Sequence, residues 1–128
     1  MKPLTAEWVE KAEGDFLVAA QIMRRRKQRV LDAACFHCQQ TVEKHFKARL
    51  CEAGIVFPKT PDLVALLNLL LPLEPLWKPF LSAVQLLTDY AVDFRYPGDN
   101  ATLTEARQCL KDCKAIRREV RLSLGLPV

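Results

Sequence analysis

Residues 31–53 read LDAACFHCQQTVEKHFKARLCEA, and this stretch decides the fold class. It contains neither Gly nor Pro and is rich in Ala, Leu, Gln, Glu, Lys and Arg, all of which are compatible with a helix. Apolar side chains recur at three- and four-residue spacing on one helical face, at Leu31, Cys35, Cys38, Val42, Phe46 and Leu50. A polar line runs beside that face and consists of His37, Gln40, Lys44 and Lys47. We therefore expect a long helix with one face in a core and the other facing a partner or ligand.

Start signals place a further helix before and after this central one. Thr5 is a good N-cap, and we expect the first helix to begin after it. The apolar positions of that helix are Trp8, Ala12, Phe16, Ala19 and Met23. Thr60 and Pro61 predict the N-cap and the first residue of a third helix, which runs from Asp62 to about Leu71.

The second half of the chain predicts two more helices. Three prolines predict an irregular turn before them, at Pro72, Pro75 and Pro79. The fourth helix is expected from Pro79 or Phe80 to Phe94 or Arg95, and residues 102–105 (TLTE) form a capping box for the fifth. Five antiparallel helices with short connections predict an all-α, up-and-down bundle of four to five helices.

Composition predicts one globular domain that spans residues 1–128. Half of the 128 residues are hydrophobic and 27% are charged, which is ordinary for a folded protein of this length. The N-terminal residues lack a signal-peptide pattern. The longest apolar run, residues 63–73, is interrupted by Asn68 and Pro72 and is about half a membrane span. We therefore expect a cytoplasmic protein with no membrane partner.

The five cysteines are an odd number, so a complete set of disulfides within the chain is impossible. We expect reduced thiols, mostly on buried helix faces. The pair Cys35-x-x-Cys38, with His37 and His45 nearby in sequence, suggests zinc, but a structural site needs four converging ligands. We predict no disulfide, no metal and no other cofactor. His45, next to Phe46, is expected at the surface or rim.

Net charge is +4, and the cations are unevenly distributed. One cluster lies at the end of the first helix, at Arg24, Arg25, Arg26, Lys27 and Arg29. A stripe on the fifth helix consists of Arg107, Lys111, Lys114, Arg118 and Arg121. The cluster is explained by the favourable interaction of cations with the C-terminal end of a helix dipole. The stripe is explained by an ordinary solvated helix face. Both groups of cations also suit phosphate-bearing or acidic partners. No aromatic residues interleave with the stripe, so base stacking is not expected there.

Two blocks of the sequence resemble a known family. Residues 33–44 (AACFHCQQTVEK) resemble the second-helix signature of the HEPN family of small helical domains, which reads roughly A-x-F-H-x-Q-Q-x-x-E-K-x-x-K. The chain matches this signature at Phe36, His37, Gln39, Gln40, Glu43, Lys44 and Lys47. Residues 90–98 (YAVDFRYPG) resemble the family's Arg-Tyr-Pro segment near the end of its fourth helix. The resemblance covers nearly the whole chain and implies a helical bundle.

The resemblance also directs attention to Arg95. Many HEPN relatives are ribonucleases with an Arg, four to six residues, and then a His; Arg95 matches the Arg, but residues 100–102 (NAT) contain no His. We therefore predict no catalytic residues, unless His37 supplies the missing imidazole. The expected ligand-binding residues are Arg95, Tyr96, His37, Gln40 and Lys44. The alternatives are structural: an ion pair of Arg95 with Glu43 or Asp93, and a Tyr96 ring that plugs the bundle.

Three functions remain open. The first, implied by the resemblance, is a non-enzymatic HEPN homodimer that binds a nucleotide or RNA. It would pair with a separately encoded minimal nucleotidyltransferase, in some relatives as toxin and antitoxin. The second is a metal-independent ribonuclease toxin with an atypical HEPN active site. The third is a nucleotide-binding accessory subunit with no toxin role.

Overall fold

The computed structural model describes residues 1–94 and 96–128. Its helices are α1 (Pro3–Arg24), α2 (Leu31–Glu52), α3 (Leu63–Leu70), the 3-10 helix η1 (Pro75–Phe80), α4 (Leu81–Asp93) and α5 (Leu103–Ser123). The described residues contain no strand, and the predicted all-α helical bundle is confirmed. None of the described helices is both long and apolar enough to cross a membrane.

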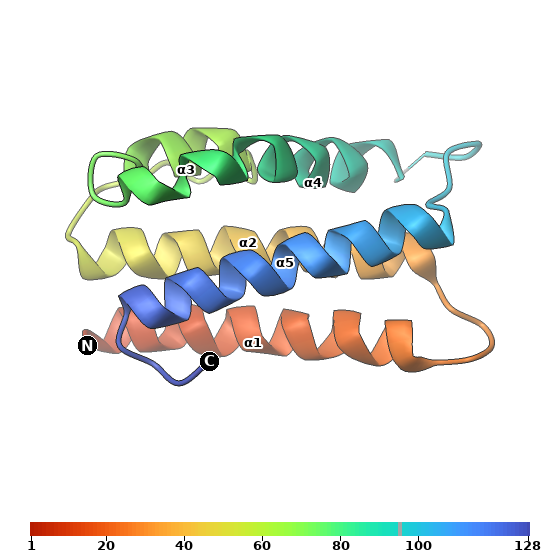
Figure 1. Ribbon diagram of the computed structural model, residues 1–128, viewed down its shortest axis with the longest axis horizontal. Helices are drawn as coiled ribbons and strands as arrows, with labels where there is room; N and C mark the ends of the chain where they lie inside the picture. Colours follow the sequence, from red (N-terminus) through yellow and green to blue (C-terminus); the bar gives the residue numbers. More distant parts are fainter. Residues whose placement is uncertain (95) are drawn as a thin grey trace.

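Helix α2 lies at the centre of the bundle, as its sequence predicts. It contacts α1, α3, α4 and α5, and Figure 1 shows it behind α5, with α1 on one side and α3 and α4 on the other. Its predicted core face is buried: Cys35, Cys38, Val42, Phe46 and Leu50 are inaccessible to solvent, and Leu31 is half-buried. Helix α5 supplies the facing layer, with Ala106, Cys109, Cys113, Ile116 and Val120 buried.

The predicted start of the first helix is wrong. Helix α1 begins at Pro3, with Lys2 at the N-cap, two residues before Thr5. Thr5 is buried within the helix, and its hydroxyl donates to Glu52 Oε1 at 3.0 Å. Proline at the first helical position suits a helix start, and the Thr5 hydroxyl is occupied by a residue from the end of α2.

The predicted start of the third helix is also wrong. Helix α3 begins at Leu63, and the Asp62 carboxylate caps it by accepting from the backbone amides of Val64 and Ala65 at 3.0 and 3.3 Å. The Thr60 hydroxyl instead accepts from the Asp62 amide at 3.1 Å, which orders the residues before the helix. A carboxylate at the N-cap also benefits from the helix dipole.

The proline-rich segment is more regular than predicted, because residues 75–80 form η1 before α4 begins at Leu81. The capping box of α5 is confirmed. The Glu105 amide donates to Thr102 Oγ1 at 3.1 Å, and the Thr102 amide donates to Glu105 Oε1 at 2.9 Å.

All five cysteines are free, and four of them meet in the core between α2 and α5. Cys35 pairs with Cys109, and Cys38 pairs with Cys113. The thiol–thiol hydrogen bonds, together with burial, raise the pKa of Cys38 and of Cys109 well above the ordinary thiol range, so both stay protonated. Among the described residues, no group of three or more His, Cys, Asp or Glu side chains is arranged to hold a metal ion.

Candidate functional site

Part of the polar line of α2 converges on one carboxylate of α1. Asp15 Oδ1 lies 2.8 Å from His37 Nδ1, and Asp15 Oδ2 lies 2.5 Å from Lys44 Nζ. The side chains of His37 and Lys44 remain 27% and 22% exposed, so a ligand can still reach them. Donation from Nδ1 to a carboxylate favours the tautomer in which Nε2 is an acceptor. Sequence analysis missed Asp15, because nothing in the sequence of α1 shows that this residue faces His37.

The other two residues of the polar line, Gln40 and Lys47, form hydrogen bonds and an ion pair within the bundle. The Gln40 amide donates to Gln39 Oε1 at 2.7 Å, and the Gln39 amide donates to the Pro61 carbonyl at 2.8 Å, which ties α2 to the segment before α3. Lys47 is buried, lies 2.9 Å from Glu43 Oε2 and lies over the Trp8 ring. The carboxylate of Glu43 therefore already has a cationic partner on its own helix.

A groove lies between the N-terminal half of α2 and the C-terminal half of α4. Its larger part has a volume of about 510 Å³ and is lined by Val30, Asp32, Ala33, Phe36, Tyr90, Ala91 and Phe94. A smaller part, about 70 Å³, shares Phe36 and Ala91 with it and extends to Gln39, Gln40, Pro61, Thr88 and Val92. Mostly apolar walls with polar groups at the edge suit a flat aromatic group or the apolar side chains of a partner. We call this the α2–α4 groove.

The groove and the Asp15 cluster are neighbours on α2. The rings of Phe36 and His37 are in edge contact, with centroids 5.3 Å apart. Phe36 lines the groove, while His37 binds Asp15 on the side of α1. Gln40 lines the smaller part of the groove, and Lys44 joins His37 at Asp15. Of these three residues only Gln40 lines the groove, whereas His37 and Lys44 lie on the α1 side of α2, at Asp15.

The segment after α4 holds the other two expected ligand residues. Phe94 lines the groove, and Tyr96 follows two residues later with 63% of its surface exposed. The alternative in which Tyr96 plugs the bundle is therefore wrong. Arg95 lies outside the described residues, so its binding role and its suggested ion pairs with Glu43 or Asp93 stay predictions.

Two of the three positions where HEPN ribonucleases carry the motif His are used structurally here. The Ala101 amide donates to Asp32 Oδ1 at 2.7 Å, and Thr102 caps α5. The segment thereby fastens the start of α5 to the start of α2.

The expectation that His45 lies at the surface is wrong. Its side chain is fully buried, and its Nδ1 atom donates to the Thr41 carbonyl at 2.9 Å. The Nε2 atom is also buried and has no hydrogen-bond partner among the described residues. Burial lowers the pKa of His45 to about 4, so the ring is neutral at physiological pH. Its neighbours Glu13, Arg117 and Arg121 belong to α1 and α5, which periodicity within α2 cannot reveal.

The described geometry agrees with the comparison with protein families. The HEPN domain model matches residues 5–123 of the chain. The chain belongs to the HEPN family. Among solved structures, the crystal structure of TT1696 from Thermus thermophilus is similar, with a TM-score of 0.78 and 21% sequence identity. The similarity covers 92% of this chain and 96% of that one, and at this identity it shows the fold alone.

No curated protein sequence matches the chain significantly. The HEPN assignment confirms the resemblance found in residues 33–44 and 90–98. In this HEPN chain the His of the helix signature, His37, is held by a carboxylate from the neighbouring helix, and its Phe lines the α2–α4 groove.

Proposed function

We propose that this HEPN protein is a cytoplasmic homodimer of single-domain chains that binds a nucleotide or RNA at the α2–α4 groove. In this proposal it has no catalytic activity of its own and pairs with a separately encoded minimal nucleotidyltransferase, as toxin and antitoxin. The observation that carries the binding proposal is the groove itself. Gln40 lines it, Phe36 joins it to the neighbouring His37, and its end residue Phe94 precedes Arg95 and Tyr96.

The groove and its edge supply complementary contacts for a nucleotide. The apolar walls around Phe36 and Ala91 suit the face of a base, and the exposed Tyr96 ring suits stacking on a second base or on the same one. Lys44 brings a positive charge for phosphate, and the Arg95 guanidinium would grip two phosphate oxygens together, which an ammonium group cannot do.

The test of this site is mononucleotide binding by Arg95→Ala. Loss of a charge-assisted contact should weaken ATP or AMP binding, measured by calorimetry, by about 1.5–3 kcal/mol. The matched control is Arg118→Ala, which removes an exposed arginine of α5 and should leave the affinity unchanged. Equal affinity of wild type and Arg95→Ala would contradict the proposed site.

The partner proposal rests on family membership. It predicts that the product of a neighbouring nucleotidyltransferase reading frame, when coexpressed, copurifies with this chain in a defined ratio. If no such reading frame lies beside the gene, the paired role is contradicted, and the role of an accessory nucleotide-binding subunit replaces it.

One observation favours the second function, a metal-independent ribonuclease. The Asp15–His37 contact orients an imidazole in the way a general base requires, with Nε2 as the acceptor. A cleavage assay with unstructured RNA in excess chelator separates the two functions. The binding proposal expects no cleavage above background, whereas cleavage abolished by Arg95→Ala, His37→Ala and Asp15→Asn alike would establish the ribonuclease.

A further inference from the structure

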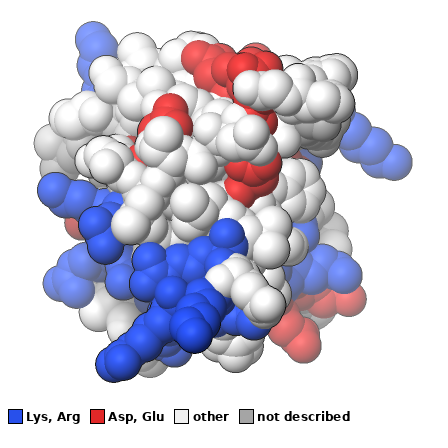
Figure 2. Space-filling view, turned by 90° about the vertical axis from the view of Figure 1, so that its right-hand side faces the viewer, with Lys and Arg blue, Asp and Glu red and all other residues white. Residues whose placement is uncertain are grey.

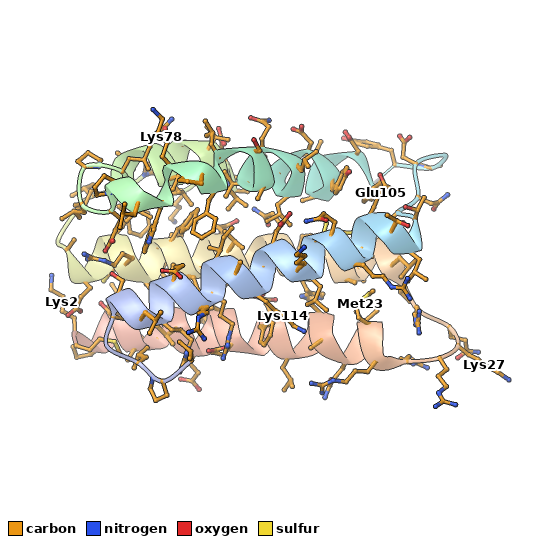
Figure 3. The ribbon with its side chains drawn as sticks, viewed as in Figure 1. Lys2, Met23, Lys27, Lys78, Glu105 and Lys114 are labelled. Carbon is orange, nitrogen blue, oxygen red and sulfur yellow. The ribbon has the colours of Figure 1, made fainter. Side chains whose placement is uncertain are left out.

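A second groove lies on a different face, between the C-terminal half of α1 and the N-terminal half of α5. It has a volume of about 380 Å³ and is lined by Met23, Arg107, Leu110, Lys111 and Lys114. Figure 3 shows Met23 and Lys114 between α1 and α5, with Lys27 beyond the end of α1. None of the residues that line the α2–α4 groove takes part in it.

The fold joins two cationic segments at this groove that are far apart in the sequence. Helix α1 ends beside the groove, and the cluster that follows consists of Arg24, Arg25, Arg26, Lys27 and Arg29. Figure 2, which looks at this end of the molecule, shows a continuous block of Lys and Arg at its lower edge. With the three cations of α5, the surface carries eight positive charges; we call it the α1–α5 basic surface.

The three cations that α5 contributes to this groove differ from others on the same helix. Arg117 Nε lies 2.8 Å from Glu13 Oε2, and Arg121 also binds Glu13. Within the described part of the chain, no ion pair involves Arg107, Lys111 or Lys114. Of the stripe seen in the sequence, Arg121 thus helps to hold α5 to α1, whereas Arg107, Lys111 and Lys114 face solvent at the groove.

Helix energetics do not account for the solvent-facing cations of this groove. Arg107 and Lys111 lie in the N-terminal half of α5, whereas the helix dipole favours cations at the C-terminal end. Positive charges gathered without counterions repel one another, which costs stability unless an anionic partner is present. The lining side chains other than the cations are aliphatic, Met23 and Leu110, so the groove offers no ring for a base to stack on.

We propose that the α1–α5 basic surface binds the phosphodiester backbone of an RNA strand without reading its sequence. Arg107, Lys111 and Lys114 follow one another by about 6 and 4.5 Å along the helix axis, so they present a row of charges to successive phosphates. The strand would continue over the Arg24–Arg29 cluster. This contact goes beyond the proposed function, because it uses neither Arg95 nor the α2–α4 groove and lies on a different face of the molecule.

The test compares Arg107→Gln/Lys111→Gln/Lys114→Gln with the wild type by fluorescence anisotropy. The probes are an unstructured RNA oligonucleotide and DNA of the same sequence, each titrated over a range of salt concentrations. Each phosphate contact on a single strand contributes about 0.7 to the slope of log K against log salt, so the variant's slope should be smaller by about 2. At about 0.1 M salt the same relation predicts a loss of about 100-fold in RNA affinity. Because these cations contact phosphates alone, the variant should lose affinity for the DNA strand in the same proportion.

The control removes three charges elsewhere, in Lys11→Gln/Lys59→Gln/Lys78→Gln, all of which are exposed. It should keep the wild-type slope. The groove variant should in turn keep the wild-type affinity for ATP, which separates this proposal from the mononucleotide site. The proposal is overturned if the groove variant keeps the wild-type slope, or if the control loses as much affinity, since binding then follows net charge. It is also overturned if the groove variant binds RNA normally and loses binding to polyglutamate, because the surface then recognises an acidic protein.

Discussion

At the scale of single residues, His45 shows how burial sets the protonation state of a side chain. It is enclosed between α2, α1 and α5, its Nε2 atom lacks a partner among the described residues, and burial lowers its pKa from 6.5 to about 4. Glu13, nearby, is balanced differently: burial raises its pKa, but the hydrogen bond and charge of Arg117, with the other cations, lower it by more. The same region of the bundle thus disfavours the protonated form of the His45 ring and favours the ionised form of the Glu13 carboxylate.

The His45 pKa predicts how stability depends on pH. Between pH 6.5 and about 4 the unfolded chain binds a proton that the folded chain does not, so the free energy of unfolding should fall as pH falls. The loss across this window should be about 3 kcal/mol, complete near pH 4 and absent above pH 6.5. Urea denaturation at a series of pH values measures it.

The variant His45→Leu removes the titrating group and should flatten the profile in that window. Loss of stability from Glu13 should remain, but at lower pH, because its depressed pKa acts below the ordinary value of 4.5. If the wild type and His45→Leu lose stability in parallel between pH 6.5 and 4, His45 does not titrate as described.

At the scale of the elements, the helix starts show how local signals compete. Thr60-Pro61 and Asp62 are both acceptable starts for α3, and the chain uses Asp62, whose carboxylate accepts from two amides. Thr5 resembles a cap by sequence but donates to Glu52, the last residue of α2, which lies beside the start of α1. The capping box at Thr102 and Glu105 has no such competitor and forms as predicted.

The choice of cap at α3 can be tested directly. Asp62→Ala should lower the free energy of unfolding by about 1 kcal/mol, because two amides of the first turn lose their acceptor. Thr60→Ala should cost less, since that hydroxyl accepts from a single amide outside the helix. Thermal and urea denaturation of both variants give the comparison. A larger effect of Thr60→Ala would restore Thr60 as the cap.

At the scale of the whole molecule, apolar surface remains beside the α2–α4 groove. Val30 and Val92, which line the groove, are 59% and 50% exposed. A second copy of the chain would cover these residues through a two-fold interface, in which the same surface serves both subunits. The same interface would bring both Arg95–Tyr96 segments, which follow α4, toward one site.

Light scattering is expected to give twice the chain mass of 14.6 kDa at micromolar concentration. Val92→Lys should shift the protein toward the monomer, because it places a charge in the middle of the covered surface. Leu76→Lys is the matched control: Leu76 is 89% exposed on η1, outside the α2–α4 groove, and its replacement should not change the mass. A monomeric wild type, or equal effects of the two variants, would contradict the proposed interface.

The sequence by itself determined the class of the fold, the order of its long helices and the buried face of α2. These follow from apolar spacing within one segment, and that spacing is fixed by the 3.6-residue repeat of the helix whatever packs against it. The two blocks around His37 and Arg95 also identified the family before any contact was known. The sequence further listed Gln40 and Lys44 as site residues; Gln40 lines the groove, and Lys44 lies with His37 at Asp15.

Only the tertiary structure decided which polar side chains are held by a partner and which are exposed to solvent. Asp15 holds His37 and Lys44, and Glu13 binds Arg117 and Arg121, whereas Arg107, Lys111 and Lys114 face solvent. Packing against α1 and α5 likewise buries His45, while Tyr96 stays exposed after α4. The physical reason is common to all of them: each depends on a partner, or on the absence of cover, from a helix distant in the sequence, and periodicity within one helix contains no information about that neighbour.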